Sequence, residues 1–284
     1  RMSSPEAKRP RNSRYPLRDR SKVATIPFEV PEWAGKKAVN TCIIDSFLAM
    51  LLCAKWKDPS FSTLLKGQSK FTEACREFLD GGDCDLEERK DEFIKKLFKP
   101  DKHGEFDLEG DEASMILDKA KEASQIVVTS VCHTCEKQVS FHKDYFYTGR
   151  EERELSDLLC DALAQLNRRH RCLDMELCKN AERDSSLTTF DTTWMLPFDL
   201  SQIGLTHDKI ALLPHGIEVA GVKFRLRGVS LFGGFHYTSV LFDDTDWYFY
   251  DGIDTPPIKM YSSAESLVVE PFYRIKIAYY LRVN

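Results

Sequence analysis

The sequence lacks any apolar run close to the roughly 20 residues that a membrane-spanning helix needs. Its first residues are basic and polar, unlike an apolar secretory signal segment, and no internal repeat is visible. Hydrophobic residues still make up 42% of the 284 residues, which is enough to form a buried core. We therefore expect a globular protein that does not enter membranes and that resides in the nucleus, the cytoplasm or both.

The sequence also lacks the even number of cysteines that a fully paired disulfide framework would need. The chain has nine, and an odd count without a signal segment argues against a disulfide framework and predicts a reducing, intracellular compartment. Reduced thiols can act as apolar filler, as metal ligands or as a nucleophile. We interpret Cys53, Cys75 and Cys160 as buried filler.

Charge is distributed unevenly along the chain, which has a net charge of −5. Residues 1–22 carry eight basic and two acidic side chains, a net charge of +6, so the remainder carries −11. This pattern predicts a disordered basic tail over residues 1–24 and a single domain over residues 25–284. The KRPR run from Lys8 to Arg11 could serve as a nuclear address or contact nucleic acid. A DNA-binding function would rest on this tail alone and is not favoured.

The hydrophobic pattern divides the chain into a helical first half and a strand-rich second half. Apolar residues from Ile44 to Leu52 recur at helical spacing after Thr41, and residues 61–125 continue a helical pattern. A further helical stretch is expected over residues 152–168. Strand-like runs follow at residues 126–131, 192–200, 217–232, 237–242, 247–250 and 273–283. This order predicts an α+β fold with an antiparallel sheet.

Cys42 is the candidate nucleophile. It stands at the first turn of the hydrophobic helix, where Asn40 or Thr41 could act as the cap. The partial positive charge and unpaired N–H groups of a helix N-terminus favour a thiolate, and the same N–H groups can bind an oxyanion. On the helix alone, a buried structural cysteine would be the more common interpretation.

A candidate base and its orienting acid lie in a predicted β-hairpin over residues 233–252. If Phe242 pairs with Trp247 across the acidic turn, His236 and Asp251 share one face as diagonal neighbours, about 7–8 Å apart between backbones. Asp251 could then accept the imidazole Nδ1–H and leave Nε2 facing a thiol. A register shift of one residue would place the two side chains on opposite faces.

A metal site is also predicted. Cys132 and Cys135 are separated by two residues, and Cys172 and Cys178 form a second, wider pair. Four thiolates in two pairs suit a tetrahedral structural Zn²⁺. His133 or His170 could replace one ligand, and cysteines without metal are the alternative.

The order of these motifs resembles that of the ubiquitin-specific proteases, which cleave the isopeptide bond after the C-terminal diglycine of ubiquitin. The segment from Asn40 to Ser46 is similar to the family's cysteine box. His236-Tyr237 and the segment from Trp247 to Asp251 fit the spacing of its histidine and aspartate boxes. The segments from Trp194 to Leu200 and from Ala278 to Leu281 resemble its late core strands.

This sequence departs from the family pattern at several positions. Lys37 stands where the family usually has the oxyanion-binding Asn, so Asn40 or the backbone N–H of Cys42 would have to serve instead. Phe235 replaces the Gly before the catalytic His, and Asp45 replaces the usual Asn after the nucleophile. The SUMO-cleaving branch of the same superfamily tolerates both changes, which makes SUMO a competing substrate.

The resemblance implies a papain-like, ubiquitin-specific-protease-type cysteine protease fold, with a reduced zinc-finger-like insert at about residues 130–180. It implies a thiol isopeptidase in which Cys42 attacks, His236 transfers the proton and Asp251 orients the imidazole. Asn40 and the N–H of Cys42 would bind the oxyanion. The partners would be ubiquitin or SUMO and the proteins conjugated to them. Two alternatives stay open: a binding module without turnover, and a papain-like peptidase that cleaves ordinary peptides.

Overall fold

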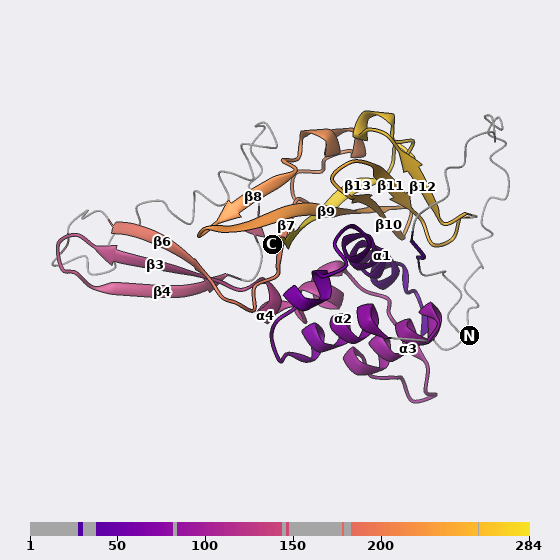
Figure 1. Ribbon diagram of the computed structural model, residues 1–284, viewed down its shortest axis with the longest axis horizontal. Helices are drawn as coiled ribbons and strands as arrows, with labels where there is room; N and C mark the ends of the chain where they lie inside the picture. Colours follow the sequence, from indigo (N-terminus) through magenta and orange to yellow (C-terminus); the bar gives the residue numbers. More distant parts are fainter. Residues whose placement is uncertain are drawn as a thin grey trace, which may run out of the picture.

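The computed structural model describes residues 28–30, 38–81, 84–143, 146–147, 178, 183–254 and 256–284. The predicted tail over residues 1–24 and the predicted helix over residues 152–168 lie outside the described residues. Figure 1 shows a layer of helices beneath a large sheet and a smaller sheet that projects to one side. Among the helices of the described segments, none has both the length and the apolar character needed to cross a bilayer.

The helical layer comes from the first half of the chain, as predicted. Its elements are α1 (Cys42–Lys57), η1 (Phe61–Leu64), α2 (Lys70–Asp80), α3 (Leu86–Leu97), a turn of π-helix η2 (Ala113–Leu117) and α4 (Lys121–Ser124). Side-chain caps fix two of the starts: Ser69 accepts from the Thr72 N–H before α2, and Asp85 accepts from the Glu88 N–H before α3. Helix α1 is buried along most of its length, because it packs against strands of the large sheet on one side and against α2 on the other.

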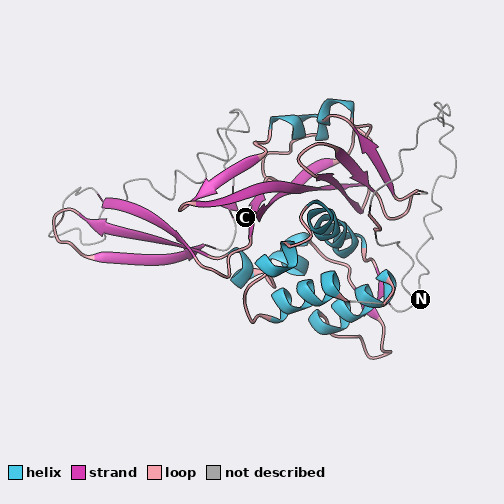
Figure 2. Cartoon of the chain, viewed as in Figure 1, coloured by secondary structure: helices cyan, strands magenta, loops and turns pink. Residues whose placement is uncertain are grey.

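The large sheet has eight strands and is almost entirely antiparallel. Its strands are β5 (Phe146–Tyr147), β7 (Met195–Asp199), β8 (Gly216–Val219), β9 (Val222–Gly233), β10 (His236–Phe242), β11 (Trp247–Tyr250), β12 (Ile258–Tyr261) and β13 (Arg274–Arg282). The order is β12-β11-β10-β9-β13-β7-β5, with β8 paired to β9, and only β5 and β7 run parallel. Figure 2 shows the strands stacked over the helices.

Both faces of this sheet are covered. Leu241, Tyr248 and Tyr279 pack into the core that the sheet shares with α1 and α2. Phe242 and Tyr280, their alternates along the strands, pack into a second core on the opposite face, beneath the short 3₁₀ helices η3 (His207–Leu212) and η4 (Ala264–Ser266). Burial on two faces explains why these strands have continuous apolar sequences instead of an alternating pattern.

The projecting sheet has three antiparallel strands in the order β4-β3-β6. They are β3 (Ile126–Cys132), β4 (Gln138–Lys143) and β6 (Arg183–Thr189). A short parallel pair, β1 (Ala38–Val39) with β2 (Phe106–Asp107), lies just before α1.

The mixed arrangement of helices and antiparallel sheet confirms the α+β prediction at this level. One expected strand was wrong in detail: residues 217–232 form the hairpin β8–β9 and not a single strand. Its turn, Ala220-Gly221, has φ values of 52° and 78°. Turns of this kind are usually recognised in a sequence by Asn-Gly or Asp-Gly. Ala at the first position concealed the turn.

Candidate active site

Cys42 begins α1 and is half-buried. The helix is held by its packing beneath β9 and β10, so the sulfur is presented from a rigid element. Thr41 occupies the N-cap position but makes no side-chain cap, because its hydroxyl donates to Asp45 Oδ2 at 2.6 Å. The first N–H groups of α1 therefore receive no acceptor from Thr41 and remain suited to binding an oxyanion.

His236 and Asp251 lie together on the β10–β11 hairpin. Phe242 pairs with Trp247, as the sequence predicted, and the ladder continues to Ser239 and Tyr250. The His236 ring lies with Nε2 2.7 Å from Asp251 Oδ1. The same carboxylate oxygen accepts a hydrogen bond from the N–H of Ile253 at 3.2 Å, which helps to hold the Asp251 side chain in place where β11 ends and the loop begins.

The expected use of the two ring nitrogens was wrong. Nε2, and not Nδ1, faces Asp251, so Nδ1 is the nitrogen left to face Cys42, which helps to raise the pKa of the same ring. The sequence predicts that the side chains of His236 and Asp251 lie on one face of the hairpin, but it does not determine the rotation of the imidazole ring. The orienting role expected of the acid is compatible with either nitrogen, because the two can exchange tasks.

The electrostatics of His236 favour the protonated ring. Burial disfavours the charge, but the hydrogen bonds and negative charges of Asp251 and Cys42 outweigh it and raise the pKa of His236 to about 9. A ring that holds its proton beside a sulfur is the arrangement needed for an imidazolium–thiolate pair. The fold thus brings together Cys42 at the start of α1, His236 at the start of β10 and Asp251 just after β11.

Asn40, the predicted oxyanion donor, is exposed and adopts a left-handed backbone with φ of 58°. Its side-chain amide donates to Asp107 Oδ1 at 2.8 Å, and the pairing of β1 with β2 brings Asp107 to this position. One amide hydrogen is thus used to hold the turn before Cys42, which leaves the other for a substrate. Lys37, the departure at the usual oxyanion position, lies outside the described residues.

A buried ion pair lies one helical turn after Cys42 on α1. Asp45 Oδ1 is 2.9 Å from Nζ of Lys90 on α3, and the two side chains are only 1% and 0% exposed. Glu87 Oε2 lies 3.6 Å from the same ammonium group. Burial raises the pKa of Asp45 to about 6, and the charge of Lys90 and the hydrogen bond from Thr41 limit the rise. Sequence reasoning missed Lys90, because a charged residue in an amphipathic helix normally faces solvent.

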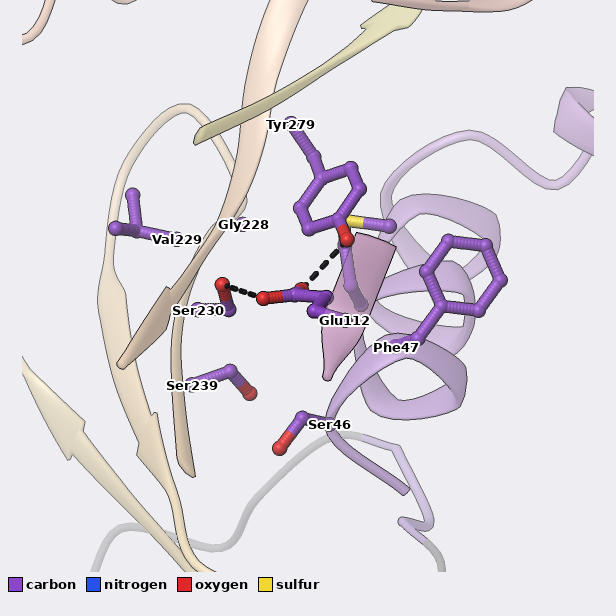
Figure 3. Close-up of a pocket in the computed structure, with 9 residues that line it drawn as sticks. Ser46, Phe47, Glu112, Gly228, Val229, Ser230, Ser239 and Tyr279 are labelled. Atoms are coloured by element: carbon purple, nitrogen blue, oxygen red, sulfur yellow. Dashed lines mark hydrogen bonds between the residues drawn. The ribbon is translucent and has the colours of Figure 1, made fainter. Parts of the chain in front are cut away.

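A second buried carboxyl, Glu112, joins the helical layer to the sheet (Figure 3). It accepts hydrogen bonds from Ser230 Oγ on β9 at 2.5 Å and from Tyr279 OH on β13 at 2.6 Å. Burial raises its pKa to about 7 despite these two donors. Ser46 and Ser239 line the same small cavity with buried hydroxyls that have no hydrogen-bond partner among the described residues. Sequence reasoning missed this network, because Glu112 is separated from both partners by more than 100 residues.

Three of the predicted metal ligands come together at the projecting sheet. The sulfurs of Cys132, Cys135 and Cys178 all lie within 4.8 Å of one another. Cys132 and Cys178 are buried, and the Glu136 N–H to Cys132 carbonyl bond of 2.9 Å closes the tight turn between the first two. These three cysteines could hold a metal ion. Cys172 and the alternative ligand His170 lie outside the described residues, and His133 does not belong to the cluster.

Cys53 and Cys75 are fully buried in the main core, which confirms their interpretation as filler, and burial raises the pKa of both thiols. Cys160, the third cysteine interpreted in this way, lies outside the described residues.

Comparison of the chain with models of known protein families finds no match. A search of curated proteins likewise finds no similar sequence.

Proposed function

We propose that this protein is a cysteine isopeptidase that removes ubiquitin, or alternatively SUMO, from conjugated proteins. One observation supports the chemistry above all others: the His236 ring lies 2.7 Å from Asp251, and Cys42, at the N-terminus of α1, is near enough to help raise the pKa of the same ring. A buried structural cysteine would need neither a polarised imidazole nor a helix terminus. The substrate class rests on the resemblance of the cysteine, histidine and aspartate segments to those of ubiquitin-specific proteases.

The reaction follows from the placement of these groups. The Cys42 thiolate attacks the carbonyl carbon after the diglycine, and the developing oxyanion accepts from the Cys42 N–H with help from Asn40. His236 donates its proton to the leaving lysine amine, so that the C–N bond breaks and a thioester remains. The neutral ring then takes a proton from the water that attacks the thioester carbonyl, the C–S bond breaks, and the C-terminal carboxyl group and the Cys42 thiolate are released. Asp251 keeps the ring oriented throughout.

We also propose that Cys132, Cys135 and Cys178 bind structural zinc, with Cys172 as the fourth ligand. Three sulfurs within 4.8 Å fit the geometry that Zn–S bonds of about 2.3 Å require. Zinc would tie the tip of the projecting sheet to the segment containing Cys178. It would take no part in hydrolysis, because the ion would be enclosed by protein ligands.

The proposed function is tested with ubiquitin and SUMO that carry either a C-terminal rhodamine leaving group or a vinyl-sulfone electrophile. We expect turnover of at least one rhodamine substrate and covalent labelling of the wild-type chain, with both lost in Cys42→Ala. Neither modifier reacting, while the Cys42→Ala variant binds one of them, would favour a binding module without turnover. Faster cleavage of a short fluorogenic peptide than of either modifier would favour a general peptidase.

A further inference from the structure

The small cavity beside Glu112 lies between α1, which carries Cys42, and β10, which carries His236 (Figure 3). Ser46 lines the cavity from α1, one helical turn after Cys42. Ser239 lines it from β10, a short way along the strand from His236. The cavity is therefore placed where the helical layer meets the strand that bears the imidazole.

Two buried hydroxyls face this cavity. Ser46 is 4% exposed and Ser239 is 3% exposed, and neither Oγ atom has a hydrogen-bond partner among the described residues. Figure 3 shows both hydroxyls pointing into the space between α1 and the sheet. Burying a hydroxyl without a partner destabilises a protein, so buried polar groups are nearly always paired with protein or with ordered water. Two such hydroxyls in one cavity indicate a polar molecule bound between them.

The carboxyl group of Glu112 offers a further polar partner in the same cavity. Its Oε2 accepts a hydrogen bond from Ser230, and its Oε1 accepts one from Tyr279. Each carboxylate oxygen has two lone pairs, so each can accept another hydrogen bond. Neither Ser46 nor Ser239 bonds to this carboxyl directly. Polar groups that share a cavity without touching are the setting in which a bridging molecule acts.

The size and lining of the cavity favour water as that molecule. A volume of about 10 Å³ is open to the centre of a water-sized sphere, which is enough for a single water. Buried waters typically make about three hydrogen bonds, and the two hydroxyls and the carboxyl supply three. Calcium and magnesium ions take about six oxygen ligands or more, which these groups do not provide. The walls formed by Phe47, Met50 and Val229 are apolar and leave a larger polar ligand without partners.

We propose that this cavity binds one ordered water molecule, which bridges Ser46 on α1, Ser239 on β10 and the carboxyl group of Glu112. The water accepts a hydrogen bond from one hydroxyl and donates its two hydrogens to the other hydroxyl and to the carboxylate. All three buried groups are then satisfied. The water joins the helix that carries Cys42 to the strand that carries His236, and this role does not depend on the proposed hydrolysis.

A high-resolution crystal structure of the full chain tests the site directly. We expect one peak of electron density within about 3.2 Å of the Oγ atoms of both Ser46 and Ser239. The peak should be absent from the double variant Ser46→Ala with Ser239→Val. A direct hydrogen bond between the two hydroxyls, or bonds from both to backbone carbonyl groups, would overturn the proposal.

A set of alanine variants tests whether the two hydroxyls act through one water. Ser46→Ala and Ser239→Ala should each lower the melting temperature by roughly 2–8 °C, because each leaves the water with one partner fewer. The double alanine variant should lose clearly less than the sum of the two, since the water is already weakly held after either change. Additive losses would overturn the bridging arrangement.

A larger apolar side chain tests whether space for the water exists. Ser46→Ala with Ser239→Val removes both hydroxyls and places methyl groups in the cavity, so it should melt above the double alanine variant. A lower melting temperature would overturn the proposal. Ser124 is the matched control: it is 1% exposed, does not line this cavity and donates its hydroxyl to the Ala120 carbonyl at 3.1 Å. Ser124→Val should therefore melt below Ser124→Ala, because its methyl groups overpack the site.

Hydrogen exchange tests whether the water joins α1 to β10. In the double alanine variant the backbone amides of both elements should exchange at least about threefold faster, while those of α3 keep their wild-type rate. Equal acceleration in all three elements would mean a general loss of stability and would overturn this role. Unchanged exchange in α1 and β10 would overturn it as well.

Discussion

The ion pair between Lys90 and Asp45 provides the sharpest test of how the nucleophile helix is held. Lys90→Met removes the charge but fills most of the same buried volume. Asp45 is then left 1% exposed and without its counter-ion, and breaking a buried pair in this way typically costs about 3–5 kcal/mol. Because Lys90 opposes the rise in the pKa of Asp45 caused by burial, its loss should raise that pKa above the present value of about 6. At pH 7 a larger fraction of Asp45 would then be protonated than in the wild type.

Chemical and thermal unfolding at two pH values would measure this effect. For a protein of this size each kcal/mol corresponds to about 2–4 °C, so we expect the melting temperature of Lys90→Met to fall by roughly 6–20 °C at pH 7. The deficit should be smaller at pH 5, because protonating a carboxyl costs about 1.4 kcal/mol less for each pH unit. The control is the double variant Asp45→Asn with Lys90→Met, in which no buried charge remains from this pair. Glu87 is 41% exposed and can turn to solvent, so this variant should lie within about 1 kcal/mol of the wild type.

Two results would refute this reasoning. A cost below about 1 kcal/mol for Lys90→Met at pH 7 would mean that water reaches the pair and that the burial seen here is incomplete. A double variant as unstable as the single variant would mean that the packing of the Lys90 side chain, and not its charge, supports α1.

Three further predictions follow from the site. The hydrolytic rate should fall above about pH 9, where His236 loses its proton. Asp251→Asn should move this alkaline fall in rate to lower pH, because Asp251 raises the pKa of His236. An unchanged pH profile would contradict the pairing of His236 with Asp251. The pKa of Glu112 rises from 4.5 to about 7 on folding, so its contribution to stability is fully present below about pH 4.5 and is lost as the pH rises through 7. Glu112→Gln should flatten the pH dependence of unfolding by up to about 3 kcal/mol across that window, and an unchanged profile would place the titration elsewhere. Elemental analysis should find about one zinc per chain, reduced in Cys135→Ser but not in the control Cys84→Ser, whose side chain is exposed and outside the cluster; a metal-free wild type would reject the site.

The parts of the structure that follow from local chemistry were predictable from the sequence. The spacing of its apolar residues predicted helix α1. The acidic turn between two aromatic strands predicted the register of β10 and β11, with Phe242 opposite Trp247. Alternation of side chains then placed His236 and Asp251 on one face without any knowledge of the rest of the fold. The two-residue separation of Cys132 and Cys135 likewise showed which thiols lie close together.

The parts that depend on distant packing were not predictable. The rotation of the His236 ring, the use of the Asn40 amide by Asp107 and the burial of Lys90 are all decided by contacts between segments far apart in the chain. The sequence does not distinguish a solvent-exposed lysine on α3, or a solvent-exposed glutamate before η2, from a buried one. Their burial becomes visible only when the helical layer has been placed against the sheet.

The buried polar groups bear on the geometry of the candidate site. Cys42 comes from the helical layer, and His236 and Asp251 come from the sheet, so the distance between the sulfur and the imidazole depends on how the two layers are held. Apolar packing alone tolerates repacking and small shifts, whereas hydrogen bonds to charged groups are short and directional. Asp45 fixes the start of α1 to α3, and Glu112 fixes the segment before η2 to β9 and β13. The raised pKa values of both carboxyls show that burying them costs stability. Glu112 therefore joins the helical layer to the sheet directly, whereas the Asp45–Lys90 pair acts within the helical layer and sets the position of α1 relative to α3.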